Sequence, residues 1–339
     1  TFYWTDHFGL LQWSSWHKLN SYSFMKRTAL IVGINNYAEN PLTAPENDAR
    51  EMERVLKNHA NGSRNFDCEL LISGVNRVHQ DRLKEKMLVH FKLDVEICLF
   101  FFAGHGISND LGTYLLTQDG GYYDEGVSMY ELFHLAQNSP AKEVILILDC
   151  CMSGDIAAYI ANERAIMRPG LTIISSAGKD GKAVESGGNG VFTSRLIDAL
   201  EGGAADAMGR VSMASVYNYV DKILSIREQR PVFKTHIKEM ITVRRAKPRI
   251  DLDILKELPD LFPSKDYNFP LDKSYERTEE EHKEAHVKIF SKLQKLNRES
   301  LIKPHPQEDM YFAAVEEGSC HLTPLGKYYW EMALKELIY

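Results

Sequence analysis

The sequence has no apolar stretch near the roughly 20 residues that a membrane-spanning helix needs. Its longest apolar run, VEICLFFFAG at 95–104, has the length of a buried strand instead. An excess of basic residues is also missing, since 40 Lys and Arg stand against 47 Asp and Glu, for a net charge of −7. Proteins that bind nucleic acid or acidic membranes through charge carry the opposite balance. We therefore expect no membrane partner and no general nucleic-acid binding.

Cysteine is scarce, and its spacing lacks the pairs that a metal or disulfide framework needs. The chain has five cysteines, an odd number, and no Cys-x-x-Cys pair. Cys68, Cys98 and Cys320 lie in apolar, strand-like contexts, where we expect core filler. Cys150 and Cys151 stand side by side. This usage favours a reducing compartment, and we expect a cytoplasmic protein.

Residues 1–24 differ in composition from the rest of the chain. They hold three of the four tryptophans and lack the basic start of a signal peptide, and Met25 follows them just before a clear strand. We expect a leader or an added segment, with Met25 as the natural start. The alternative is an apolar arm that docks on the domain or on a partner.

Between residues 25 and 247 the pattern alternates between near-continuous apolar strands and amphipathic helices. The expected strands cover 29–35, 68–73, 95–104, 143–149 and 171–177. The expected helices cover 47–59, 80–91, 128–138, 191–202 and 212–225. This order predicts an α/β domain in which helices sandwich a mainly parallel sheet. Sites in such sheets form at the carboxyl ends of the strands, which directs attention to the residues after Phe102 and after Leu148.

A second region follows. Residues 248–271 are rich in proline and aspartate and are expected to be a linker. Residues 272–339 begin as helices, and the stretch from Met310 predicts strand, turn, strand and a final helix, which resembles a winged-helix module. Many such modules bind DNA, but this one carries ten Lys and Arg against thirteen Asp and Glu. We therefore prefer a regulatory or protein-docking role and keep DNA binding as an alternative.

Two of the predicted strands end in residues that carry chemistry. FFFAGHGISND places His105 between Gly104 and Gly106, and ILILDCCMSGD ends its strand in Asp149-Cys150-Cys151. A histidine on an adjacent strand end can act as the base that converts a cysteine to its thiolate. The flanking glycines would let a substrate backbone approach closely. The backbone N–H groups of Gly106 and Cys151 are candidates for an oxyanion hole.

These two motifs, with His105 and Cys151 46 residues apart, resemble those of the caspase-like cysteine peptidases. The closest pattern is that of the metacaspase and orthocaspase branch, of the prokaryotic type, and the resemblance extends over about 26–245. It implies the caspase-haemoglobinase-like fold, Cys151 as the nucleophile and His105 as its base. Cys150 falls at a position that varies in the family, and we expect a small apolar filler there.

The resemblance also implies a substrate. The metacaspase branch holds an arginine or lysine side chain at the P1 position with two aspartates, which correspond here to Asp48 and Asp149. Paired carboxylates suit a guanidinium group in a partly desolvated pocket. We therefore expect protein cleavage after Arg, then Lys, and not after Asp. A helix-start residue at Asp48 and a strand-end cap at Asp149 are the structural alternatives.

The sequence departs from the family pattern in two places. Met152 replaces the usual histidine after the nucleophile, and we expect altered loop packing from it. The paired acidic element of the calcium-dependent members is incomplete, although Asp119 and Asp124 are present. We expect no metal and no cofactor, with calcium at these aspartates as the weaker alternative.

Regulation follows from the same resemblance. The segment after the nucleophile corresponds to the family's intersubunit linker, where Arg164 and Arg168 are candidate processing sites for self-cleavage or for an upstream activating protease. A surface helix with scattered charges is the alternative. An inhibitor protein is a further candidate partner, and the family association is with stress or defence responses. The rival interpretations are a catalytically silent caspase-fold adaptor and a DNA-binding regulator that acts through residues 272–339.

Overall fold

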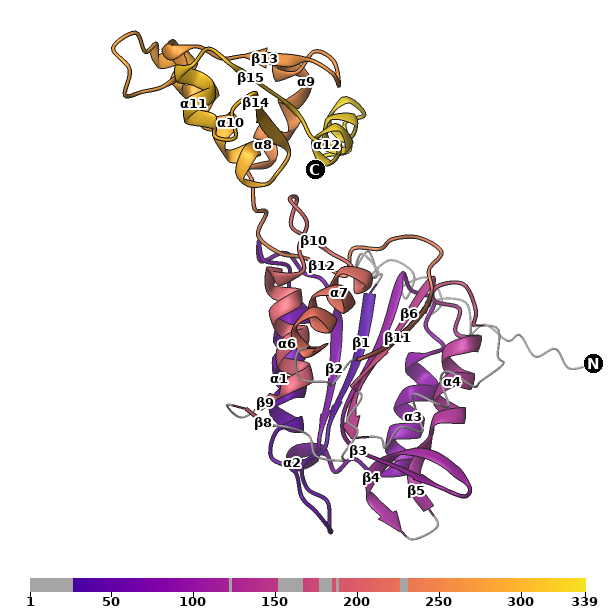
Figure 1. Ribbon diagram of the computed structural model, residues 1–339. Helices are drawn as coiled ribbons and strands as arrows, with labels where there is room; N and C mark the ends of the chain where they lie inside the picture. The colour runs from indigo at the N-terminus through magenta and orange to yellow at the C-terminus, as the bar shows by residue number, and fades with distance from the viewer. Residues whose placement is uncertain (1–26, 122–123, 152–166, 177–184, 187–188, 226–230) are drawn as a thin grey trace, which may run out of the picture.

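The computed structural model describes residues 27–121, 124–151, 167–176, 185–186, 189–225 and 231–339. Its centre is an eight-stranded, mainly parallel sheet with the order β11-β7-β6-β3-β1-β2, extended beside β3 by β4 and β5 (Figure 1). The strands are β1 (Arg27–Gly33), β2 (Asp67–Ile72), β3 (Ile97–Asn109), β4 (Gly112–Gly121), β5 (Asp124–Ser128), β6 (Glu143–Cys151), β7 (Leu171–Ser175) and β11 (Val232–His236).

Helices cover both faces of this sheet. The helices α1 (Pro45–Lys57), α6 (Val191–Asp198) and α7 (Met213–Leu224) lie on one face, and α3 (Gln80–His90) and α4 (Met129–Asn138) lie on the other (Figure 1). The fold is therefore the α/β class expected from the sequence, a mainly parallel sheet between helices. Short elements complete this part of the chain: α2 (Ser73–Asn76), β8 (Glu185–Ser186), β9 (Asn189–Gly190), η1 (Ala199–Gly203), β10 (Arg210–Val211) and β12 (Arg244–Arg245).

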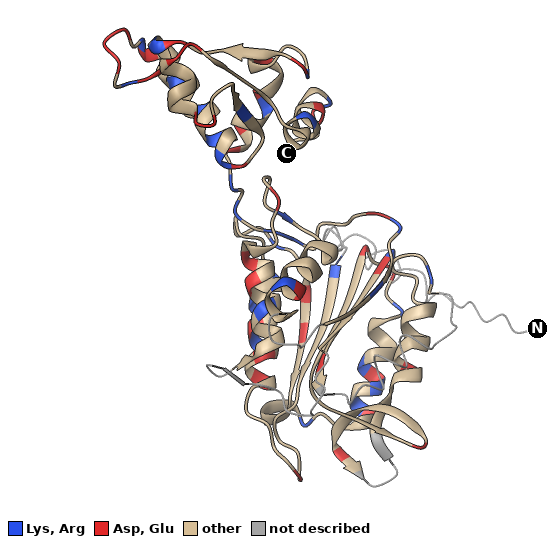
Figure 2. Cartoon of the chain, in the orientation of Figure 1, with Lys and Arg blue, Asp and Glu red and all other residues tan. Residues whose placement is uncertain are grey.

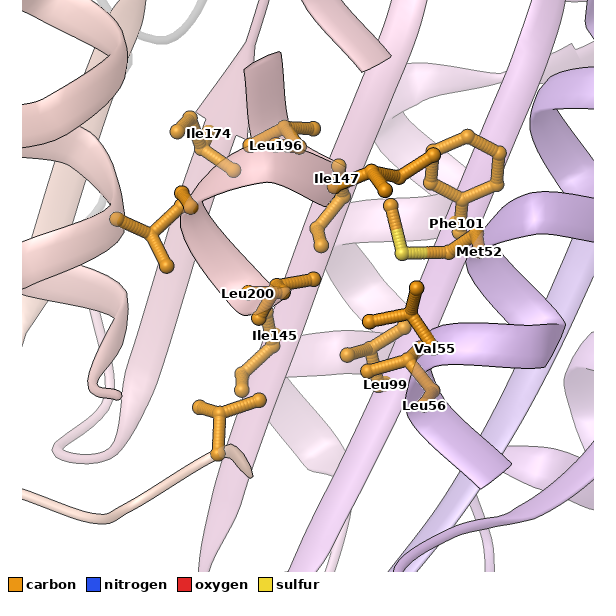
Figure 3. Close-up of a cluster of buried hydrophobic side chains, with 14 of the residues drawn as sticks. Met52, Val55, Leu56, Leu99, Phe101, Ile145, Ile147, Ile174, Leu196 and Leu200 are labelled. Atoms are coloured by element: carbon orange, nitrogen blue, oxygen red, sulfur yellow. The ribbon is translucent and has the colours of Figure 1, made fainter. Parts of the chain in front are cut away.

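Two separate apolar clusters hold the layers together. Successive side chains of a strand point to opposite faces, so Phe101 enters the cluster under α1 while Phe100 and Phe102 enter the cluster under α3 and α4. Figure 3 shows the first cluster, in which Met52 and Leu56 of α1 meet strand residues from the centre of the sheet. Because the central strands are buried on both faces, their sequences are continuously apolar rather than alternating.

The sequence pattern does not indicate the strands β4, β5 and β11. β11 runs antiparallel to β7 at the edge of the sheet, and its side chains are half-buried or exposed. β4 and β5 form a hairpin that continues from the end of β3. None of the three has the apolar run that identifies a central strand.

Residues 248–271 are not the linker expected from their composition. They contain α8 (Leu252–Lys256), α9 (Leu258–Leu261) and β13 (Asn268–Pro270). Ile254, Leu255 and Phe262 are buried in the apolar cluster of residues 248–339, which we call the C-terminal unit. The prolines and aspartates that suggested a linker start helices and turns instead, as Asp251 does by capping α8.

The secondary structure of 310–322 is also corrected. Met310–Val315 forms the helix α11 rather than a strand. The strands are β14 (Ile302–His305) and β15 (Ser319–Leu322), and β15 lies between β13 and β14 in a three-stranded sheet. α10 (Glu284–Arg298) and α12 (Pro324–Leu334) complete the unit, with the short turn η3 (Lys273–Tyr275) before them. The winged-helix resemblance of this unit stays a prediction.

The C-terminal unit lies beyond the amino ends of the central strands (Figure 1). Arg210 donates to the hydroxyl oxygen of Tyr328 in α12 over 3.4 Å, and the Arg245 guanidinium lies 5.3 Å from the ring centre of Tyr339. Ala207 and Met208 are buried in the apolar cluster of the C-terminal unit. Acidic and basic residues both occur along this unit (Figure 2).

Candidate active site

The backbones of His105 and Cys151 are direct neighbours. β3 and β6 are parallel, and their register pairs His105 with Cys151 and Ala103 with Asp149. Both strands therefore deliver their motif residues to the same edge of the sheet, as the sequence predicts. The side chain of Cys151 lies outside the described residues. Cys150 is only 3% exposed and belongs to the apolar cluster under α3 and α4, as expected for a core filler.

The imidazole of His105 has a defined orientation. Its Nε2 lies 2.7 Å from the backbone carbonyl oxygen of Asn40. A carbonyl can only accept a hydrogen bond, so we assign the ring proton to Nε2, which leaves Nδ1 with the lone pair of the neutral ring. Asn40 reaches this position with φ of 54°, a left-handed conformation that asparagine tolerates better than most residues.

Tyr37 holds the same histidine from another side. Its hydroxyl oxygen accepts the backbone N–H of His105 over 2.9 Å and donates to the carbonyl of Leu116 over 3.3 Å. The two rings lie 4.7 Å apart between centroids, tilted by 52°. Burial strongly raises the pKa of Tyr37, so its hydroxyl stays protonated and can serve as both donor and acceptor.

The segment that carries Tyr37 and Asn40 is anchored at its base. The backbone N–H groups of Asn35 and Asn36 both donate to the Ser73 hydroxyl, over 3.0 and 3.1 Å. The side-chain oxygen of Asn35 also accepts the N–H of Glu46 over 2.9 Å. The stretch LIVGINNY (30–37) contains Asn35, Asn36 and Tyr37, and Asn40 follows shortly after it. Nothing in the sequence alone marks Tyr37 and Asn40 as partners of His105.

The two predicted P1-binding aspartates come together at one point. Asp48 is buried in the first turn of α1, and both of its carboxylate oxygens accept the N–H of Gly190, over 3.0 and 3.1 Å. Asp149 at the end of β6 accepts from the hydroxyl of Thr193 over 2.6 Å and from its N–H over 3.3 Å. A Cβ atom on Gly190 would lie 3.0 Å from an oxygen of each aspartate, so both carboxylates border the space that a side chain at this position would occupy.

Both aspartates therefore face the amino end of α6, for which Gly190 is the N-cap. Helix N-terminal N–H groups and the helix dipole stabilise negative charge there. Burial nevertheless raises the pKa of Asp149, against the lowering effect of the hydroxyls of Thr193 and Ser176. The helix end explains how two acidic groups are tolerated close together inside the protein.

The structure also places Gly106 and Asp119. Gly106 follows His105 in β3, and its register partner is Leu115 of β4. The oxyanion-hole role of the Gly106 and Cys151 N–H groups stays a prediction. Asp119 accepts the N–H of Gln80, the first residue of α3, over 3.0 Å and the hydroxyl of Thr117 over 2.8 Å. These bonds give its carboxylate a structural use at the helix start.

The absence of a metal or cofactor stays an expectation, with calcium as the weaker alternative. Among the described residues, Asp119 could share an ion with His79 and Asp81, whose ligand atoms lie within 4.8 Å of one another. All three are exposed or half-buried, and such groups are common without an ion. Asp124 begins β5, and its side chain lies outside the described residues.

The two candidate processing sites differ. Arg164 lies outside the described residues, as does Met152. Arg168 precedes β7, and its guanidinium donates to backbone carbonyls that include those of Ser139, over 2.8 Å, and Ala141, over 2.6 Å. Arg168 thus anchors the chain before β7, and cleavage after it stays a prediction.

Comparison with known proteins bears on the same part of the chain. The family model described as the caspase domain matches residues 26–242. Among solved structures, a protein from Geobacter sulfurreducens is similar at 17% identity, with 66% of this chain and 98% of that chain covered and a TM-score of 0.47. Caspase-1 from Spodoptera frugiperda is similar at 12% identity, with 66% and 91% covered and a TM-score of 0.47. The Drosophila initiator caspase Dronc is similar at 12% identity, with 62% and 80% covered and a TM-score of 0.45.

No curated protein matches the chain. Among the residues that the structure describes, no helix combines the length and apolar character needed to cross a membrane.

Proposed function

This chain belongs to the caspase-domain family of cysteine peptidases, and from that premise we propose that it is an endopeptidase that cleaves proteins after arginine or lysine. One observation carries the proposal: a single edge of the sheet holds the His105 and Cys151 backbones in register and, beside them, two converging aspartates. A base, a nucleophile and an acidic pocket are the parts that such a reaction requires.

In the proposed reaction, Nδ1 of His105 takes the proton of the Cys151 thiol, and the thiolate attacks the carbonyl carbon of the scissile peptide bond. The resulting oxyanion accepts hydrogen bonds from the N–H groups of Gly106 and Cys151. His105 then donates its proton to the leaving amine, and the C–N bond breaks to leave a thioester. A water molecule, deprotonated by His105, hydrolyses the thioester and restores the thiol.

The Asn40 carbonyl supports each of these proton transfers. It accepts the Nε2–H of His105 at 2.7 Å, and this bond becomes charge-assisted when the ring is an imidazolium. The charged ring is thereby stabilised at the steps where it forms. The bond also keeps the ring from turning Nε2 toward the nucleophile.

Substrate selection in this proposal rests on charge. A P1 guanidinium placed between Asp48 and Asp149 has an anionic partner on each side and can form bidentate bonds. A lysine ammonium has the same charge but no planar fork, so it is expected to be the weaker substrate. A P1 aspartate would bring a third carboxylate to a buried acidic site and would be rejected.

The test is a panel of fluorogenic peptides that differ only in a P1 Arg, Lys or Asp, assayed with the purified chain and its Cys151→Ala variant. We expect turnover of Arg peptides, slower turnover of Lys peptides and none of Asp peptides, all lost in the variant. Cleavage of Asp peptides without Arg peptides, or activity that survives in Cys151→Ala, would contradict the proposal. Running the panel with calcium and with a chelator tests the proposal that no cofactor is needed.

We further propose that activation involves proteolytic processing or a partner protein, in a stress or defence response. Purified Cys151→Ala protein should then lack any self-made cut after Arg164 or Arg168, and a cut that persists there would refute self-processing. The C-terminal unit contacts the peptidase through Arg210 and Tyr328, away from the His105 edge (Figure 1). Its proposed role is therefore docking or indirect restraint rather than covering the site.

A further inference from the structure

We propose that Tyr37 is a positioning residue for His105, and that Gly104 lacks a side chain because the Tyr37 hydroxyl occupies the space that a side chain would need. The inference rests on the proposed function, since it concerns how the same histidine is aimed at Cys151. It assigns a task to a buried tyrosine that lies 68 residues from the histidine in sequence.

The hydroxyl of Tyr37 joins two backbone segments at the site. It accepts the N–H of His105 over 2.9 Å and donates to the Leu116 carbonyl over 3.3 Å. The first bond ties β3 at His105, and the second ties β4, the strand that pairs with the last residues of β3, at Leu116. Because the side chain is only 7% exposed, water is a poor substitute for either bond.

The ring of Tyr37 restricts the imidazole as well. The rings are 4.7 Å apart and tilted, while the Asn40 carbonyl holds Nε2. Tyr37 and Asn40 belong to one short segment that Ser73 anchors through the N–H groups of Asn35 and Asn36. One segment thus supplies a backbone tie, a ring contact and a proton acceptor to the same histidine.

Gly104 is explained by the same hydroxyl. A Cβ on Gly104 would lie 2.4 Å from the Tyr37 hydroxyl oxygen, a distance at which something must move. The next nearest atoms, on the ring of Phe102, would lie at 3.1 and 3.2 Å, which is tight but tolerable after small shifts. The glycine before His105 is therefore required from inside the protein, in addition to any close approach of substrate.

The first experiment compares Tyr37→Phe with Tyr329→Phe in the chain of 339 residues. Tyr329 is a matched control, because it is also buried, bonds to the backbone of Ala207 and belongs to the C-terminal unit. Measured quantities are the melting temperature, kcat and KM on an Arg peptide, and the pH dependence of iodoacetamide alkylation at Cys151, followed by peptide mass spectrometry in a Cys150→Ala background.

For Tyr37→Phe we expect kcat to fall about 10- to 100-fold with little change in KM, since a displaced base of this kind costs up to about 100-fold. Alkylation should begin at a higher pH, because a misaligned imidazole stabilises the thiolate less. Tyr329→Phe should lower the melting temperature without either change. If Tyr37→Phe also loses only stability and keeps the wild-type kcat and alkylation profile, the positioning role is overturned.

The second experiment tests the steric link between Tyr37 and Gly104. Gly104→Ala should lower kcat strongly in the wild-type background and by a smaller factor in the Tyr37→Phe background, where the hydroxyl is gone. Equal factors in both backgrounds would refute the steric link.

The measurements distinguish a failure of the peptidase proposal from a failure of the positioning role of Tyr37. If no Arg or Lys peptide is cleaved but Cys151 alkylation depends on His105, the peptidase proposal fails and the alkylation profile of Tyr37→Phe still decides the positioning role. If alkylation of Cys151 is unchanged in His105→Ala, no working pair exists and the role assigned to Tyr37 fails with it.

Discussion

The conformation of Asn40 allows a sharp test of how His105 is held. Its carbonyl accepts the Nε2–H of the imidazole while the residue adopts φ of 54°. Glycine reaches this conformation freely, asparagine tolerates it, and a β-branched residue does not. We therefore compare Asn40→Gly with Asn40→Val. Both remove the amide side chain, but only the second opposes the backbone conformation.

The expected magnitude follows from two opposing terms. The left-handed conformation costs an ordinary L-residue about 1–2 kcal/mol, and a β-branched residue lies at the upper end of this range or beyond. A hydrogen bond to a charged group contributes about 1.5–3 kcal/mol. With Val the strain is comparable to the bond that it maintains, so the segment is expected to relax and the bond to be lost. At about 1.4 kcal/mol per factor of ten, kcat should fall about 10- to 100-fold.

The assay is kcat on an Arg peptide, with Asn40→Gly expected within about threefold of wild type because its backbone needs no strain. Glu336 supplies a matched control position for the same two substitutions, since it has φ of 55°, is exposed and lies in the C-terminal unit. Glu336→Val should cost stability without changing kcat. If Asn40→Gly and Asn40→Val lose activity equally, the side chain of Asn40 matters rather than its carbonyl, and the reasoning is wrong.

Three further predictions concern the acidic site and the anchor before β7. Gly190→Ala should lower kcat/KM for Arg peptides about 5- to 150-fold, since its Cβ would lie 3.0 Å from oxygens of both Asp48 and Asp149 and overpacking of this kind costs about 1–3 kcal/mol. Unchanged kinetics would refute a pocket between these carboxylates. Burial raises the pKa of Asp149 in the native state, so the native state binds a proton more tightly than the unfolded chain. The free energy of unfolding therefore declines as pH rises from the unfolded-state pKa of Asp149 through its native-state pKa. Asp149→Asn should therefore raise the melting temperature at neutral pH, show no such gain in acid, and abolish cleavage after Arg. A lower melting temperature of this variant at neutral pH would contradict the desolvation argument. Arg168→Ala should destabilise the chain by about 2 kcal/mol in urea unfolding, because the carbonyls of two buried residues, Ser139 and Ala141, lose their donor. Arg64→Ala, which removes one exposed ion pair, should cost less than about 1 kcal/mol, and equal effects would show that Arg168 is no anchor.

Much of the fold is predictable from local pattern. Continuous apolar runs identify the central strands because those strands are buried on both faces, and the capping pair of Ser128 and Glu131 marks the start of α4. The C-terminal unit shows where this reasoning fails. Pro and Asp in 248–271 are equally typical of loops and of helix starts, and MYFAAV is too short for its periodicity to separate strand from helix.

The sequence alone identifies the two residues that we expect to carry the chemistry, His105 and Cys151. Their residue types, their glycine or acidic neighbours and their place after apolar strands are all in the sequence, and the parallel sheet needs only to bring the strand ends together. The same holds for only one of the two aspartates, because Asp149 lies two residues before the nucleophile, while Asp48 comes near Asp149 only through the position of α1.

What surrounds these residues was decided by the tertiary structure. Tyr37 and Asn40 act on His105 across more than 60 residues of chain, through one hydroxyl and one backbone carbonyl. The approach of Gly190 to both aspartates depends on where α6 begins. Backbone groups carry no residue-type signal, and close approach between distant segments depends on the packed sheet and helices. The sequence thus identifies the reacting groups, and the fold determines their orientation.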